Sequence, residues 1–403
     1  MTDHFFYKSF LLAGLFSGLF FCAAAQRQCG TENTYLFKQR YPARYDSIEG
    51  KIAAFVQQRK LRPAAIQALR TIPVVVHILY NNNASDPTNI SDAKIFSQIN
   101  ILNQDYRRQN ADWTGTPGVW QSLVADCEVR FCLASLDAGG NPTTGIVRRY
   151  TDSTNFSLDG SPKHNNTGGS NAWPTDKYLN LWITPRIRHG ITELLGYATF
   201  PWQNMGAEDG LVIRYLAFGS LAPVSATYNL GRTATHEVGH WLGLKHIWGD
   251  EAACAADDDV GDTPLQADLH YGCPAFPNTD ACSNGNGVMF MNYMDYTDDR
   301  CMFMFTAGQK TRMDYYLAND HKSIADNAGA GCGDCPYVLN LSGSLSGTTN
   351  YRSADQIIST QNILPGAASE YKTGSKVTLS PGFHAGSGSN VQIKTDEICY
   401  PPN

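Results

Sequence analysis

The sequence predicts an α+β domain with a mixed sheet, followed by a small all-β module. One helical pattern precedes a run of strand-like segments, and a second helical segment carries three histidines. Residues 339–394 contain only short β segments and Gly/Ser turns, with no helical period. A length of 403 residues suits two or three folding units, one of them large enough for a substantial core.

Residues 1–25 are typical of a secretion signal. Lys8 supplies a positive start, residues 11–21 an apolar stretch, and residues 23–25 a small-residue cleavage site. No later segment approaches the ~20 apolar residues of a transmembrane helix. We therefore expect a secreted, extracellular protein. The alternative is a lipid anchor on Cys22, but Phe21 stands where such a motif requires a small residue.

Residues 26–70 are interpreted as a prosegment. They open with Arg27-Gln-Cys29-Gly and continue as a polar helical stretch over residues 48–59. The basic run from Arg59 to Arg70 suits exposure and proteolytic nicking.

The large domain is expected over residues 71–327. The run Ile72–Tyr80 predicts its first strand, and Ser91 is placed to cap a helix. That helix has apolar residues at Ile95, Ile99, Leu102 and Tyr106. Further strands are expected at Val129–Leu136, Gly145–Tyr150, Tyr178–Thr184, Glu193–Pro201 and Gly210–Tyr215.

A Gly-rich linker is expected at Asn327–Pro336, and the β module over residues 336–403. With the run Pro381-Gly-Phe-His-Ala-Gly-Ser-Gly-Ser-Asn390, this module resembles the small stacked β domains appended to many secreted Bacteroidetes proteins. The sequence assigns it no chemistry.

Composition excludes some functions. The net charge of −6 and the lack of any Lys/Arg run give no signal for nucleic-acid binding. Ten of the 11 cysteines follow the expected signal, so export would make disulfides the default. We expect a monomer.

The segment from His236 to His246 carries the chemistry. Residues four apart on a helix face the same way, so His236 and His240 are expected to point at one spot. Gly243 would let the chain leave the helix through a positive-φ turn, which brings His246 back as a third ligand. Three protein ligands leave the fourth position of Zn²⁺ for water, as in catalytic sites.

Glu237 is placed to act as general base on that water. A structural zinc would need a fourth protein ligand and would have no use for Glu237. The motif fixes five positions, which favours catalysis over histidines that merely pack.

A methionine-containing turn follows downstream. Met294 is expected to lie beneath the metal, although a lone Met near aromatic residues is more often core packing. Tyr296 is placed to reach the oxyanion through its hydroxyl.

The run His236–His246 followed by Met294 resembles the metzincin clan of zincin proteases, and more narrowly the pappalysin family. The resemblance covers roughly residues 70–320. It is supported by residues 195–201, 209–213, 261–264, 292–299, 301–302, 305–306 and Gln309. It implies a metzincin catalytic domain with zinc as its cofactor.

The resemblance also implies further features. Tyr296 would stabilise the transition state. Four cysteines would pair as Cys254–Cys282 and Cys273–Cys301. The acidic segment 257–263, with Asp258 and Thr263, would bind calcium, whereas such an acidic run taken alone is more often a solvated loop.

One position departs from the family pattern. Relatives that cleave beside basic residues carry an acidic residue before the last of these four cysteines, and here Arg300 stands there. An arginine in the specificity pocket would repel Lys and Arg side chains, so a basic specificity is not carried over.

Cys29 is a candidate latency ligand, because a thiolate binds zinc well. The alternative is that Cys29 forms an ordinary disulfide. The pairing of Cys127, Cys132, Cys332, Cys335 and Cys399 stays open, although Cys127 and Cys132 are expected to lie too far apart to bond each other.

Three functions remain in competition. The first is a secreted zinc endopeptidase, made as a latent zymogen, that acts on protein or peptide substrates. The second is an adhesive protein on an inactive scaffold, which the intact Glu237 disfavours. The third is a zinc hydrolase of non-peptide bonds, which the methionine turn disfavours.

Overall fold

The computed structural model describes residues 27–61, 69–81, 86–283, 285–326, 338–353, 356–373 and 376–395. The expected secretion signal with Cys22 and the expected linker lie outside these residues, as do Cys332, Cys335 and Cys399. Within the described ranges, no helix combines the length and apolarity needed to cross a bilayer.

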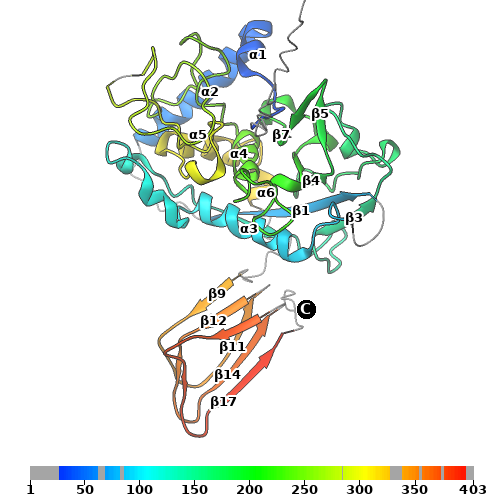
Figure 1. Cartoon of the computed structure of the whole chain (residues 1–403), viewed down its shortest axis with the longest axis vertical. Coiled ribbons are helices and arrows are strands. Elements are labelled where there is room, and N and C mark those ends of the chain that lie inside the picture. Colours follow the sequence, from blue (N-terminus) through cyan, green and yellow to red (C-terminus); the bar gives the residue numbers. More distant parts are fainter. Residues whose placement is uncertain are drawn as a thin grey trace, which may run out of the picture.

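A mixed sheet organises the large domain (Figure 1). Its central strand is β1 (Arg70–Tyr80), in which residues 72–79 are all buried. A strand covered on both faces needs such a continuous apolar run. The sheet order is β2-β1-β4-β8-β7, and β3 pairs with the far end of β1. β7 runs antiparallel to β8, whereas the other pairings in this sheet are parallel. The bounds are β2 Val129–Leu133, β3 Ile146–Tyr150, β4 Leu179–Thr184, β7 Gly196–Ala198 and β8 Leu211–Arg214.

The expectation of one strand over Glu193–Pro201 is wrong. β6 (Thr192–Leu194) pairs with β5 (Ile187–His189) in a separate antiparallel ladder, and β7 joins the main sheet. Leu195 lies between them. Its carbonyl accepts a hydrogen bond from Arg214 N at 2.9 Å, and its N–H donates to Gln28 O at 2.9 Å. The chain thus turns from one ladder into another at Leu195.

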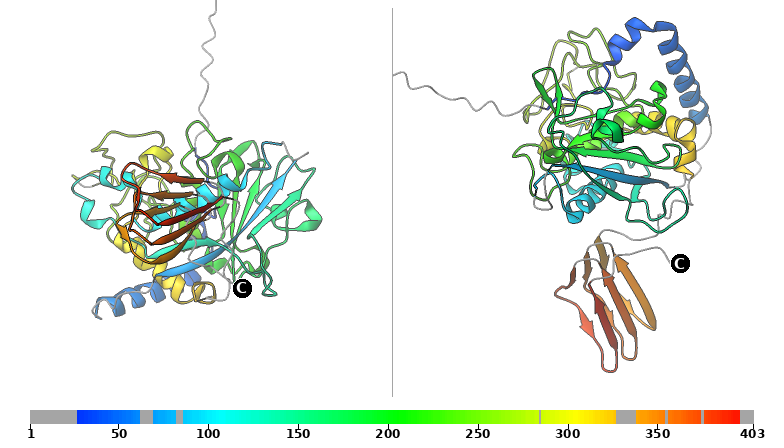
Figure 2. Two further views of the ribbon diagram at one scale, coloured as in Figure 1. Left: turned by 90° about the horizontal axis from the view of Figure 1, so that it is seen from below. Right: turned by 90° about the vertical axis from the view of Figure 1, so that its right-hand side faces the viewer.

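Helices cover the sheet. α3 (Asp92–Tyr106) begins after Ser91, whose hydroxyl accepts a hydrogen bond from Lys94 N, and Ile95 and Leu102 are fully buried. Figures 1 and 2 show α2, in blue, lying beside α5, in yellow. The remaining helices are α1 Thr34–Arg40, α2 Pro42–Lys60, α4 Arg232–Trp241, α5 Ala307–Ala318 and α6 Lys322–Ala325. Short 3-10 turns lie at Ala111–Gly115, Gln121–Leu123, Ser161–Lys163, Asn165–Thr167, Pro201–Gln203, Gly206–Glu208, Tyr215–Ala217 and Asp299–Cys301.

The C-terminal strands form three parallel three-stranded sheets (Figure 1). Each coil contributes one strand to each sheet, so the chain winds as a small parallel solenoid. Ile357, Ile363 and Tyr371 fill its interior. The all-β expectation is confirmed. The repeating coil was not predicted, although the recurring short strands and Gly turns are its signal in the sequence. The strands are β9 Val338–Leu341, β10 Ser344–Leu345, β11 Thr348–Ser353, β12 Gln356–Ser359, β13 Asn362–Ile363, β14 Ala368–Thr373, β15 Lys376–Leu379, β16 His384–Ala385 and β17 Asn390–Lys394.

Two disulfides link the segment after α4. They join Cys254 to Cys282 and Cys273 to Cys301, which is the pairing that the family resemblance implied. Cys132 is also disulfide-bonded, whereas Cys29 and Cys127 are free thiols. The expectation that Cys127 and Cys132 do not bond each other is thus confirmed.

Candidate active site

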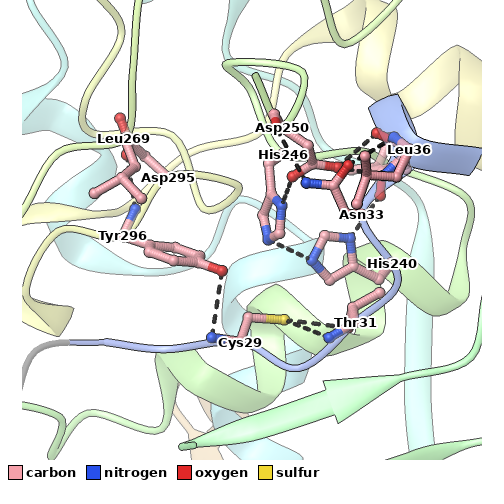
Figure 3. Close-up of polar contacts among 12 residues, drawn as sticks. Cys29, Thr31, Asn33, Leu36, His240, His246, Asp250, Leu269, Asp295 and Tyr296 are labelled. Carbon is pink, nitrogen blue, oxygen red and sulfur yellow. Dashed lines mark hydrogen bonds and ion pairs between the residues drawn. The ribbon is translucent and has the colours of Figure 1, made fainter. Parts of the chain in front are cut away.

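Three imidazoles converge at the end of α4. His236 and His240 lie one helical turn apart on this helix, and both are buried. The Nε2 atom of His240 lies 3.1 Å from Nε2 of His236 and 3.1 Å from Nε2 of His246. Figure 3 shows the rings of His240 and His246 facing each other.

The opposite nitrogen of each ring is held by the surrounding chain. Nδ1 of His236 donates to Tyr293 O at 2.7 Å, and Nδ1 of His240 donates to Leu244 O at 2.8 Å. Nδ1 of His246 contacts the Asp250 carboxylate. This leaves Nε2 lone pairs facing one another, an arrangement that a shared cation stabilises. Burial and the neighbouring imidazoles hold the pKa of His236 and of His240 well below the usual value. The donor set therefore fits a zinc ion.

Gly243 provides the turn that returns the chain to this spot. Its φ is +83°, and a Cβ there would lie 1.9 Å from Cε2 of Tyr316. Both the backbone conformation and the contact with Tyr316 therefore require glycine.

Glu237 lies beside the three imidazoles with 1% of its surface exposed. Its Oε2 atom accepts hydrogen bonds from Thr31 Oγ1 at 3.1 Å and from the Cys29 thiol at 3.4 Å. Burial raises the pKa of the Glu237 carboxyl to about 7. A Cβ at Gly196 would lie 3.0 Å from Oε1, so the carboxylate is enclosed between β7 and the N-terminal segment.

The segment around Cys29 lies across this site (Figure 3). Cys29 Sγ and one nitrogen from each of the three histidines all lie within 4.8 Å of one another. Gly30 N donates to Gly196 O at 2.9 Å, and Cys29 pairs with Gly196 in a parallel bridge. Burial and the charge of Glu237 raise the pKa of the Cys29 thiol well above its usual value.

Met294 and Tyr296 lie where the methionine turn was expected. Met294 is fully buried, and its sulfur lies 2.5 Å from where a Cβ on Gly239 would stand, directly against α4. The Tyr296 ring lies 5.1 Å from that of His246. Its hydroxyl accepts a hydrogen bond from Cys29 N at 3.3 Å (Figure 3).

Next to the site, the Arg27 side chain is buried among Asp299, Tyr228 and Thr233, which together form the Arg27 pocket. Its NH2 group donates to Asp299 Oδ1 at 2.6 Å, and both side chains are buried. Its guanidinium lies 5.0 Å from the centre of the Tyr228 ring, and NH1 donates to Thr233 Oγ1 at 3.3 Å. The other oxygen of Asp299 accepts from Leu230 N at 2.8 Å.

Arg300, which was expected to line the specificity pocket, does not line the pocket that holds Arg27, and its role in specificity stays a prediction. The Arg300 side chain is 74% exposed and lies 3.8 Å from Asp298 Oδ2. Consecutive residues in the short turn Asp299–Cys301 point in different directions, so Asp299 faces the interior while Arg300 faces solvent.

The carboxylates of the acidic segment 257–263, which follows α4, have different contacts. Asp259 contacts Lys245, and Asp262 accepts from Thr306 Oγ1 at 2.6 Å at the start of α5. Asp258 is buried, and its Oδ1 accepts from Thr263 Oγ1 at 2.8 Å. Its Oδ2 has no hydrogen-bond partner among the described residues. Burial and the neighbouring Asp257 raise the pKa of Asp258 well above its usual value.

Three residues at this site were missed by the sequence analysis. Asp250 lies four residues after His246, a spacing that could have indicated a partner for that ring. Asp299 lay inside a segment that carried the family resemblance but was given no role. No local signal pointed to Thr31.

Comparisons with known proteins agree with this geometry. The family model described as pregnancy-associated plasma protein-A matches residues 163–318. An extracellular metalloprotease of Arthroderma benhamiae is 30% identical over 298 residues, which are 72% of this chain and 90% of the relative. One from Arthroderma otae is 34% identical over 248 residues, which are 60% of this chain and 76% of the relative.

Solved structures are also similar. A mutant of promirolysin from Tannerella forsythia is 42% identical, with a TM-score of 0.67, covering 76% of this chain and all of that one. Mature Tannerella forsythia mirolysin with a cleaved peptide is 45% identical, with a TM-score of 0.63, covering 67% of this chain and all of that one. The chain therefore belongs to the peptidase family of pregnancy-associated plasma protein-A, the pappalysin metzincins, and is a zinc metalloendopeptidase.

Proposed function

We propose that this protein is a secreted zinc endopeptidase made as a latent zymogen, with Glu237 as its general base. One observation supports the proposal most directly. The Cys29 sulfur and the ligand nitrogens of His236, His240 and His246 all lie within 4.8 Å of one another. In the zymogen, Cys29 would hold the fourth position of the metal and so exclude water.

The three histidines would hold the zinc. When bound, the metal lowers the pKa of its water and polarises the scissile carbonyl. Glu237 is buried beside the histidine nitrogens that would hold the zinc, and no cation in the described structure forms an ion pair with its carboxylate. The carboxylate is therefore free to take a proton from the water bound to the metal. The Tyr296 hydroxyl accepts a hydrogen bond from Cys29 N and so faces the space beside the three histidines. From there it would donate a hydrogen bond to the oxyanion that develops during peptide hydrolysis.

The pocket that holds Arg27 suggests the substrate. A buried carboxylate is costly without a counter-charge, and among the described residues Arg27 is the side chain that forms an ion pair with Asp299. After removal of the prosegment, the side chain of a substrate would take this place. We therefore propose that the enzyme prefers peptides with Lys or Arg at this subsite.

A calcium ion is proposed at Asp258. The unpartnered Oδ2 of this buried carboxylate is the feature that a cation would satisfy, with the Thr263 hydroxyl adjacent. Asp259 and Asp262 are engaged elsewhere.

Secretion is supported by the signal-like residues 1–25 and by the extracellular metalloproteases among the relatives. A lipid anchor on Cys22 is the alternative. Labelling with radioactive palmitate and testing release into the medium would separate the two.

The central test is Glu237→Gln in the matured protein. We expect zinc content by elemental analysis to remain near one per chain, while casein hydrolysis falls by roughly 10²–10⁴-fold. Full hydrolysis by this variant would refute Glu237 as the base, and the absence of zinc from the unaltered protein would refute the metal site.

A further inference from the structure

The helices α1 and α2 follow each other with only Tyr41 between them, and α2 packs beside α5 on the catalytic domain (Figure 2). The start of α1 reaches the edge of the histidine site, where Thr34 N donates to Asp250 Oδ2 at 2.7 Å. In the two helices, the apolar side chains Phe37, Tyr45 and Ile52 are buried. They form one cluster with three side chains of the catalytic domain, Phe200, Trp202 and Tyr316. The Phe37 and Trp202 rings lie 6.2 Å apart.

A buried charge cluster adjoins this apolar contact. Glu49, on α2, accepts two hydrogen bonds from Arg312, with NH1 at 2.7 Å and NH2 at 2.6 Å. It also pairs with Lys245 Nζ at 2.9 Å. Arg312 and Lys245 are 2% and 1% exposed. Burial alone would raise the pKa of Glu49, but the hydrogen bonds and charge of Arg312, followed by Lys245, lower it to about 2.

The two cations are positioned by the catalytic domain itself. Arg312 Nε donates to Gly243 O at 2.7 Å, and Lys245 also contacts Asp259. Removing α2 would leave these contacts in place and would uncover an aromatic face with two cations at its edge. Such a surface is complementary to an amphipathic helix that carries a carboxylate.

We propose that Phe200, Trp202, Tyr316, Lys245 and Arg312 form an exosite that binds the helices α1 and α2 without any contribution from Cys29. The exosite adjoins the histidine site, since the Phe200 ring lies 5.3 Å from that of His240. This inference rests on the proposed assignment of residues 26–70 to a removable prosegment. A prosegment cut after α2 then stays bound and keeps the site covered, so that activation requires destruction or dilution of this helix pair as well as the first cut.

The test uses the full chain with Cys29→Ala and Glu237→Gln, and with a site for a specific protease introduced between Leu61 and Leu69. After cutting, dissociation of a fluorescently labelled prosegment is followed by anisotropy. We expect the prosegment to remain bound at micromolar concentration. Adding Glu49→Gln should raise the dissociation constant by about 30-fold or more, because Arg312 and Lys245 lose their shared carboxylate. Asp46→Asn, which removes an exposed carboxylate from the same helix, should change it by no more than about twofold.

Loss of the prosegment on cutting in the Cys29→Ala background would overturn the proposal, as would equal effects of Glu49→Gln and Asp46→Asn. If the Glu49→Gln chain does not fold, synthetic peptides of residues 32–61 that carry one or the other substitution replace it. Each peptide competes with the labelled prosegment for binding to the cut protein, in which Glu49 is unchanged. The Glu49→Gln peptide should then compete about 30-fold or more weakly than the Asp46→Asn peptide, and equal competition would refute the exosite. These are binding measurements on an inactive variant. Failure of the zinc mechanism would instead appear as missing zinc or missing hydrolysis in the protein with Glu237 intact.

Discussion

The Cys29 thiol lies 3.4 Å from Oε2 of Glu237, the carboxylate proposed to activate water. The same thiol lies among the three imidazoles. One residue of the N-terminal segment therefore lies both within reach of the three imidazoles and beside the proposed base.

Replacing Cys29 by Ala should shorten the time during which the zymogen stays inactive. The expected result is faster autoprocessing and a shorter lag in casein hydrolysis, because the metal position is no longer filled by sulfur. Cys127→Ala is a matched control, since Cys127 is the other free thiol of the described structure and lies buried away from the imidazoles. An unchanged lag in Cys29→Ala would count against the latency role.

Replacing Asp299 by Asn should weaken the preference for basic side chains. With a peptide library, we expect kcat/KM for Lys and Arg peptides to fall by roughly 30-fold or more, because a buried charge pair loses its anion. Peptides with neutral side chains should change much less. Arg300→Ala is the control and should have little effect, since its side chain is mostly exposed. If Arg300→Ala changes the preference for Lys and Arg peptides strongly while Asp299→Asn does not, Arg300 and not Asp299 determines the specificity.

Calcium should stabilise the protein through Asp258. In the Glu237→Gln background, adding calcium to about 100 times its dissociation constant should raise the unfolding free energy by about 2.7 kcal/mol. Asp258→Asn should abolish this gain, whereas the exposed Asp268→Asn should keep it. Thermal unfolding with and without calcium measures the difference, and an identical response in both variants would refute the site.

His77 should make stability depend on pH. It is fully buried between Ser170 Oγ and Asn180 Oδ1, each 2.9 Å from a ring nitrogen, and burial lowers its pKa to about 4. The unfolded chain, with an ordinary pKa of about 6.5, binds the proton more readily. Stability should therefore fall as the pH drops from about 6.5 to 4, by about 3 kcal/mol in total.

Denaturant unfolding of the Glu237→Gln protein across this pH range measures that loss. His77→Gln should flatten the curve, whereas His189→Gln, at an exposed position on β5, should leave its slope unchanged. A slope that survives in His77→Gln would assign the effect to other groups.

Some features followed from the sequence because their geometry is local. The α4 histidines are four residues apart, and Gly243 and His246 follow within a short turn, so helix periodicity and turn chemistry were enough to bring them together. Ser91 at the start of α3 and the apolar run of β1 were predictable for the same reason.

Other features depended on contacts between distant parts of the chain. Arg27 meets Asp299 across 272 positions, and Glu49 meets Arg312 across 263. No periodicity or spacing encodes such pairs, because they form only when the N-terminal segment lies along β7 and α2 packs beside α5. The sequence thus determined the zinc chemistry and the α+β class. Tertiary packing decided that the Asp299 carboxylate faces the pocket around Arg27, and that Arg312 pairs with Glu49 of the proposed prosegment.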